Sequence, residues 1–195
     1  MSLKIISGLK YLIILHIQYN NFLTKLNVTN YNNCTDLIMR FISQIAKANL
    51  FIKVLAFTKI PLMFFCRPKI MEISDDRVVI KIALKRRTKN HVKSMYFGAL
   101  AVGADLAGGF LALEHIRKSK KKIVPIFKDF HADFLKRAED DVYFCCDEGE
   151  KIKSLVNEVI NSGKRCSIPV HITAYVISSH GKENVAKFIL TLSLK

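Results

Sequence analysis

The sequence predicts an α+β domain in which an antiparallel sheet packs against one long buried helix. Near the C-terminus, residues 164–178 and 184–194 alternate apolar and polar side chains, the pattern of half-buried strands. Residues 95–116 form the most apolar helix candidate in the chain, and they contain four glycines. Because each interior glycine costs a helix about 1 kcal/mol relative to alanine, we expect a sheet or a ligand to approach this helix closely.

The first part of the chain, residues 1–66, is predicted to be a mainly helical extension. Its apolar start and the Asn-rich linker that follows could contact a membrane surface. Asp36 is a candidate cap for a helix that runs to about Thr58, and Pro61 either ends that helix or starts a short second one. The main domain is therefore expected to cover residues 67–195.

The main domain is predicted to contain six strands and two helices. Its elements are two strands within 69–84, the helix at 95–116, strands at 123–135 and 141–147, a helix at 149–162 and the two alternating strands. Asp75-Asp76 marks the turn between the first two strands, and Gly163 ends the second helix. The strands at 123–135 and 141–147 follow each other directly, and we expect them to pair through a turn at Arg137 to Asp140.

Composition narrows the class of protein. Of the 195 residues, 50% are hydrophobic and 24% charged, which supports a full core and excludes global disorder. No stretch of 18 or more apolar residues is free of charge, so an integral membrane bundle is excluded. Five cysteines without a C-x-x-C pair argue against a disulfide framework and a structural zinc site. We expect a reducing location such as the cytoplasm, no metal and no resident cofactor.

The net charge of +15 is unevenly distributed along the chain. Residues 1–66 carry 7 bases and 1 acid, residues 67–122 carry 14 and 5, and residues 123–195 carry 10 of each. The basic clusters at 85–89 and 117–122 are either solvated turns and helix ends or sites that attract phosphate. A basic protein bound to a membrane or a nucleic acid is one interpretation. The absence of an aromatic-rich basic stripe makes a nucleic-acid partner unexpected.

Candidate functional residues gather between Asn90 and Asp105. A polar loop leads into a helix start, where unpaired backbone N–H groups can hold a carbonyl oxygen or an anion. Asp105 lies about two turns inside the apolar helix, where a carboxylate is costly to bury unless it is paired or used. A hydrogen bond to a neighbouring strand or helix end is the alternative for Asp105. Ser94 could contact a substrate or cap the helix, and we favour the cap.

This window and the order of the elements resemble the hotdog-fold acyl-CoA thioesterases, in particular the phenylacetyl-CoA type. That family carries an Asn, then His-Gly-Gly six residues later, and an acid nine residues after the His. Here Asn90 and Asp105 stand at the first and last positions of this pattern. Tyr96 replaces the His, and Phe97 and Gly98 stand at the two glycines.

The resemblance covers about residues 67–195 and implies a sheet curled around the long helix. It also implies a homodimer or a dimer of dimers, joined edge to edge, with the site at the dimer interface. The implied substrate is an acyl-CoA or a similar thioester, with coenzyme A present only as part of it. Asp105 would then activate water or attack as nucleophile, the N–H of Gly98 would polarise the carbonyl, and Asn90 would position the water or the thioester.

The resemblance also implies a set of substrate-binding residues around this core. They are Tyr96, Phe97, Ser94, His91, Lys93 and Arg87. Basic residues of the loop would meet the phosphates of coenzyme A. The replacement of His by Tyr96 and of Gly by Phe97 keeps a second hypothesis open, a non-catalytic acyl-CoA-binding or regulatory protein of the same fold.

Overall fold

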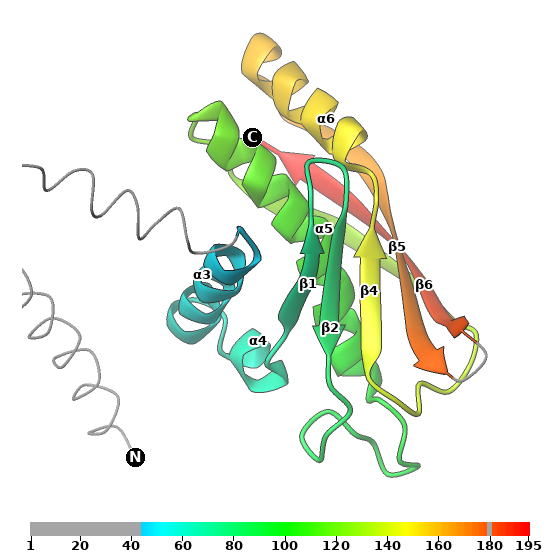
Figure 1. Cartoon of the computed structure of the whole chain (residues 1–195). Helices are drawn as coiled ribbons and strands as arrows, with labels where there is room; N and C mark the ends of the chain where they lie inside the picture. Colours follow the sequence, from blue (N-terminus) through cyan, green and yellow to red (C-terminus); the bar gives the residue numbers. More distant parts are fainter. Residues whose placement is uncertain (1–43, 179–180) are drawn as a thin grey trace, which may run out of the picture. The chain divides into compact units, whose positions relative to one another are not determined.

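A six-stranded antiparallel sheet packs against one long helix in the computed structural model, which describes residues 44–178 and 181–195 (Figure 1). The helices are α3 (Gln44–Thr58), α4 (Pro61–Cys66), α5 (Phe97–Ser119) and α6 (Gly149–Ser162). The strands are β1 (Lys69–Ile73), β2 (Val78–Ile82), β3 (Pro125–Phe134), β4 (Val142–Cys146), β5 (Cys166–Ser178) and β6 (Gly181–Leu194). This confirms the predicted α+β class. The predicted helix start at Asp36 and the apolar first residues lie outside the described residues.

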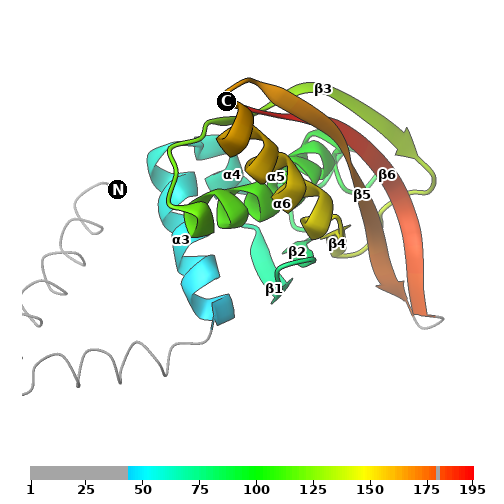
Figure 2. The ribbon, with the colours of Figure 1, turned by 90° about the horizontal axis from the view of Figure 1, so that it is seen from above.

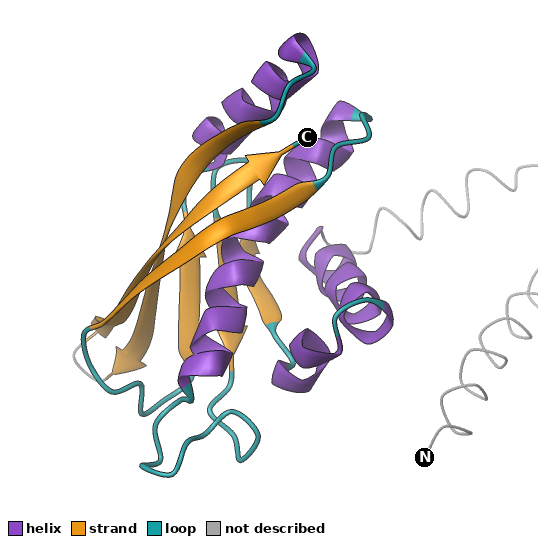
Figure 3. Ribbon diagram, turned by 180° about the vertical axis from the view of Figure 1, so that it is seen from behind, coloured by secondary structure: helices purple, strands orange, loops and turns teal. Residues whose placement is uncertain are grey.

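The strands follow the order β1-β2-β4-β5-β6-β3, and every neighbouring pair is antiparallel. The sheet curves around α5, which lies along its inner face (Figures 2 and 3). Long strands in the C-terminal half make the curved part of the sheet. The N-terminal end of α5 lies at one end of the sheet, beside the loop that follows β2 (Figure 1).

The alternating patterns of the sequence set which side of each strand faces α5. On β5, Val170 and Ile172 are buried, whereas His171 between them is exposed. On β6, Phe188 and Leu190 are buried in the same way. Because side chains of a strand alternate between its two faces, one apolar residue in two is enough to build the core.

The expected pairing of the strands at 123–135 and 141–147 is wrong. Strand β3 pairs with β6 at the edge of the sheet, and β4 lies between β2 and β5. The N–H groups of Leu135 and Lys136 donate to the carbonyl of Val185 at 2.9 and 3.1 Å, and the N–H of Met95 donates to Ala138 at 2.8 Å. The segment after β3 is thus a crossover held by other parts of the chain, and it is not a tight turn.

The glycines of α5 confirm that the sheet approaches this helix closely. A Cβ atom on Gly103 would lie 2.3 Å from the ring of Phe144, which is fully buried. At Gly109 the nearest atom would be 3.6 Å away, on Phe127. Among the described helices, only α5 has the length and hydropathy to cross a membrane, and its burial in the core accounts for that composition.

Helices α3 and α4 contribute to the same hydrophobic core. Ala48, Ile52 and Ala56 of α3 and two residues of α4 are buried in it. The side chain of Asn49 accepts a hydrogen bond from the N–H of Ile70 at 2.8 Å and donates to its carbonyl at 3.0 Å. The compact unit that the structure describes starts at Gln44, and the predicted boundary at residue 67 stays a prediction.

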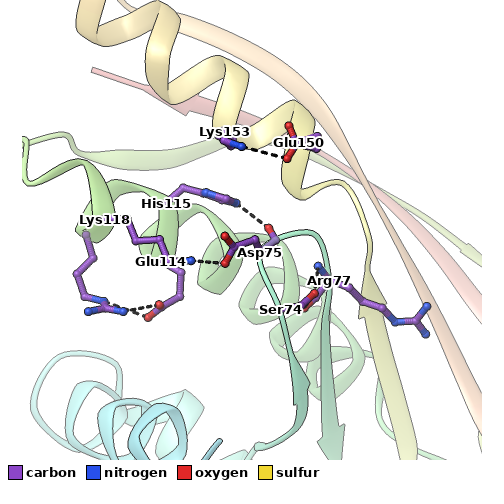
Figure 4. A network of polar contacts seen from close by, with 9 residues as sticks. Ser74, Asp75, Arg77, Glu114, His115, Lys118, Glu150 and Lys153 are labelled. Atoms are coloured by element: carbon purple, nitrogen blue, oxygen red, sulfur yellow. Dashed lines mark hydrogen bonds and ion pairs between the residues drawn. The ribbon is translucent and has the colours of Figure 1, made fainter. Parts of the chain in front are cut away.

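A polar network holds the C-terminal end of α5 (Figure 4). The buried ring of His115 donates through Nε2 to the carbonyl of Asp75 at 2.9 Å, and Lys118 bonds the Asp75 carboxylate. The hydrogen bond from Lys118 lowers the pKa of Asp75. A Cβ on Gly149 would lie 2.1 Å from the carbonyl oxygen of Asp75, so only glycine lets α6 start this close to the β1–β2 turn.

Candidate active site at the start of α5

A pocket of about 510 Å³ opens at the N-terminal end of α5. The loop after β2, the first turn of α5 and the crossover after β3 line it. Five predicted site residues are in this lining: Asn90, His91, Ser94, Tyr96 and Phe97. The structure therefore brings the continuous part of the predicted site together. The other four predicted site residues, Asp105, Gly98, Lys93 and Arg87, are not among the lining residues.

The side chain of Asn90 organises the loop that forms one wall of the pocket. Its Oδ1 accepts hydrogen bonds from the N–H groups of Val92 and Ser94, at 3.0 and 3.1 Å. Its amide nitrogen donates to the Ser94 hydroxyl at 3.0 Å. An Asn that bonds the backbone two residues ahead is a common turn device. Asn90 thus shapes the loop, and one of its two amide hydrogens has no partner in the described part of the chain.

The predicted helix cap at Ser94 is wrong. The cap position of α5 is Tyr96, and no side chain bonds the first N–H groups of the helix there. The buried hydroxyl of Ser94 is used instead for the contact with Asn90. Ser94 comes too early to cap, because the bridge between Lys89 and Met95 keeps the chain extended up to the helix.

The start of α5 presents unpaired donors. The N–H groups of Ala99 and Leu100 both donate to the carbonyl of Tyr96, at 2.9 and 3.2 Å. Within residues 44–178 and 181–195, no group accepts a hydrogen bond from the N–H of Phe97 or Gly98. Such donors, reinforced by the helix dipole, are suited to hold an oxyanion or a carbonyl oxygen.

Two aromatic rings lie beside these donors. The rings of Tyr96 and Phe97 are 4.7 Å apart between centroids, and the residues are 49% and 59% exposed. A Cβ on Gly98 would lie 2.7 Å from the Tyr96 ring, so this ring rests directly on the Gly98 backbone. The close approach of the Tyr96 ring thus explains why position 98 is a glycine.

Asp105 points out of the core and keeps contact with solvent in the single chain. The protein around its base removes part of its hydration, and this desolvation raises the pKa of the carboxyl. The expected alternative, a hydrogen bond to a strand or helix end, is not found, because no described residue bonds or pairs with Asp105. Within residues 44–178 and 181–195, Asp105 is thus an acid of the central helix that has no partner.

Some basic residues of the region line the pocket and others lie outside its lining. Lys93 is exposed and adopts a left-handed backbone, with φ at 66°. Arg87 is half-buried, and its charge opposes the rise in the pKa of the Cys66 thiol that burial causes. Lys136 and Arg137 line the pocket from the crossover, where Lys136 also pairs with Glu183.

The crossover residues are the part of the site that sequence reasoning missed. Leu135 and Ala138, together with the two basic residues and with Phe134 at the end of β3, line the pocket. No local signal predicts this, because the contact depends on the sheet order and on the hydrogen bond between Met95 and Ala138. In the part of the chain that the structure describes, no three His, Cys, Asp or Glu residues are placed to hold a metal ion.

The comparisons with known proteins agree with this architecture. A family model described as "Domain of unknown function (DUF4442)" matches residues 48–192. No curated protein matches the chain significantly. Among solved structures, a thioesterase candidate from Shewanella oneidensis is similar with a TM-score of 0.63 and 12% identity, over 75% of this chain and 96% of that one.

Two structures from Pseudomonas aeruginosa are similar as well. A protein of unknown function matches with a TM-score of 0.62 and 23% identity, over 75% of this chain and 94% of that one. A mutant of a thioesterase matches with a TM-score of 0.54 and 12% identity, over 80% of this chain and 96% of that one. Together these likenesses show the hotdog fold, which confirms the fold expected from the resemblance.

Proposed function

The chain belongs to the DUF4442 family and has the hotdog fold of thioesterase structures, and on this premise we propose that it hydrolyses an acyl-CoA thioester. The observation that carries the proposal is the Asp105 carboxyl, which has no partner among the described residues and whose pKa is raised by desolvation. A carboxylate with a higher pKa accepts a proton from water more readily. The N–H groups of Phe97 and Gly98, which donate to no described residue, offer a place for the thioester oxygen.

The Asp105 carboxyl and the N–H groups of Phe97 and Gly98 are too far apart to act on one thioester within the same chain. Seven residues separate Gly98 from Asp105, a rise of about 10 Å along a helix. A reacting carbonyl must lie about 3 Å from its donors and close to the attacking water. We therefore propose a homodimer in which Asp105 of one chain works with the partner's Gly98.

Strand β3 supports the proposed dimer. It lies at the edge of the sheet and pairs only with β6 among the described strands. Ile126 and Phe130 on it are 45% and 44% exposed. A long edge with exposed apolar residues is a template for pairing with another strand. A second β3 on this edge would continue the sheet and bring two α5 helices together.

The proposed reaction is a balanced hydrolysis. Asp105 takes a proton from water, and the water oxygen bonds to the thioester carbon. The carbonyl oxygen becomes an oxyanion, which the N–H groups at the start of the partner's helix hold. The intermediate then releases the coenzyme A thiolate, which takes up the proton, and leaves a carboxylic acid. Exposed bases of the loop, Lys85, Arg86 and Lys89, would contact the phosphates of coenzyme A.

A thiol-release assay with short, long and aromatic acyl-CoAs tests the proposal. We expect turnover by the full-length protein and a loss of at least about 100-fold in Asp105→Asn, because removal of a general base typically costs that much. An unchanged melting temperature or a higher one would show that the variant is folded. Normal turnover by Asp105→Asn would exclude Asp105 from the mechanism.

The exposed Tyr96 and Phe97 rings favour a second candidate function, binding of acyl-CoA without hydrolysis. Their rings lie at the helix start, where the related pattern has His and Gly. The same experiment separates the two functions, since a binding protein would be stabilised by acyl-CoA and release no thiol. Location in the cytoplasm and the lack of a nucleic-acid partner stay predictions from composition.

A further inference from the structure

Helix α3 is apolar on two opposite sides. Ala48, Ile52 and Ala56 are buried in the main hydrophobic core. Leu50, Val54 and Phe57 follow one another at helical spacing on the other side, and they are 63%, 54% and 53% exposed. An amphipathic helix on a globular protein would carry polar residues on that side.

The exposed apolar surface continues onto α4. Leu62 and Phe65 are 62% and 55% exposed, and the ring of Phe64 contacts that of Phe57 at 5.5 Å between centroids. We call this surface the α3–α4 face. It consists of Leu50, Val54, Phe57, Leu62, Phe64 and Phe65. A pocket of about 690 Å³ opens beside it, between α3, α4 and the start of β1. Figure 1 shows both helices beside α5 and β1.

The charged residues of α3, α4 and the first three positions of β1 all have one sign. Residues 44–71 contain five bases and no acid: Lys47, Lys53, Lys59, Arg67 and Lys69. Lys47 and Lys53 lie three residues before and after Leu50, so they flank the apolar stripe of α3. Lys53, Arg67 and Lys69 line the neighbouring pocket. In the described part of the chain, none of the five bases forms an ion pair.

We propose that the α3–α4 face binds the surface of a membrane that contains anionic phospholipids. Helices that lie in a membrane interface combine exposed Leu and Phe side chains with Lys and Arg along their flanks. The apolar side chains would enter the acyl boundary, and the bases would meet the phosphates, each base adding attraction to an anionic surface. This binding would not depend on the proposed hydrolysis.

The charges favour a membrane over the other occupants. A second copy on a two-fold axis would place the same five cations opposite each other, which is repulsive. Residues 1–43 carry four bases and one acid, so they offer no net negative charge to match these bases. Lysine is also depleted at the core of protein interfaces.

Sedimentation with vesicles tests this proposal on the full-length protein. The vesicles contain phosphatidylcholine alone or with phosphatidylserine. We expect binding only to the anionic vesicles, with a decrease at high salt. Leu50→Ser with Phe57→Ser should weaken binding about tenfold or more, and Lys53→Gln with Arg67→Gln by roughly fivefold for each charge. The controls, Ile177→Ser and Lys121→Gln with Lys122→Gln, change exposed residues of the same kinds elsewhere and should bind as wild type.

Four outcomes would overturn the proposal. The first is that the wild-type protein does not sediment with anionic vesicles. The second is that the α3–α4 variants bind these vesicles as well as the controls do. The third is a change of oligomeric state in these variants, which would indicate that a second copy covers the face. The last is a fall of several degrees in their melting temperature, which would indicate that another part of the chain covers it. Thiol release from a soluble acyl-CoA, measured in the same variants, keeps this test separate from that of the hydrolysis.

Discussion

At the scale of single residues, Asp105 is the residue on which the proposed hydrolysis depends most. It has no hydrogen-bond partner among the described residues, and the protein around it raises its pKa by desolvation. An ionised group in such a position makes the fold less stable than a neutral group of the same shape would. A residue that lowers the stability of the fold and does not contribute to its packing is a candidate catalytic residue.

The stability of Asp105→Asn should depend on pH in one direction. The pKa of Asp105 is higher in the folded state, so protonation of this carboxyl favours the folded protein. This contribution to the stability of the wild type is fully present below the unfolded pKa of about 3.9, and it is lost as pH rises through the folded pKa. The melting temperature of the variant should thus match wild type near pH 3.5 and exceed it at pH 7. Thermal unfolding at several pH values measures this. A variant less stable than wild type at pH 7 would mean that the carboxylate makes a stabilising contact.

At the scale of elements, the glycines of α5 record how closely the sheet approaches the helix. Gly103→Ala should lower the free energy of unfolding by about 1–3 kcal/mol, because its Cβ would overlap the buried Phe144 ring. Gly109→Ala is the matched control, since it has room and should gain up to about 1 kcal/mol in helix propensity. Denaturant unfolding measures both variants. Equal stability of Gly103→Ala and wild type would show that the Phe144 ring moves aside.

The elements also show how far the sequence could predict the fold and the site. The strands β5 and β6 and the helices α5 and α6 were predictable, because each carries its own periodicity or end signal. The pairing of β3 with β6 was not, since strand order depends on contacts between distant segments. For the same reason the loop from Asn90 to Phe97 was found as one window, whereas Phe134 to Ala138 on the opposite wall of the pocket was missed.

At the scale of the whole molecule, the proposed site needs two chains, and mixing two inactive variants tests this. Asp105→Asn lacks the acid, and Gly98→Pro lacks an N–H donor at a position in the first helical turn where proline is tolerated. Random exchange of subunits should restore about a quarter of wild-type thiol release, because half of the dimers are mixed and each has one complete site. Gly98→Ala, which meets the Tyr96 ring but keeps the N–H, is the control for Gly98→Pro. A mixture that stays inactive would place both groups in one chain.

The contact of Asn49 with Ile70 bears on how such chains can assemble. The Asn49 amide satisfies both backbone groups of Ile70, so it takes the position that a further strand would need beside β1. An open sheet has two edges, and growth into a fibre requires both of them. With α3 over the β1 edge, β3 is the edge of the described sheet at which a neighbouring chain can pair. In the proposed dimer, the partner would occupy this edge, and growth through the described sheet would end at two subunits.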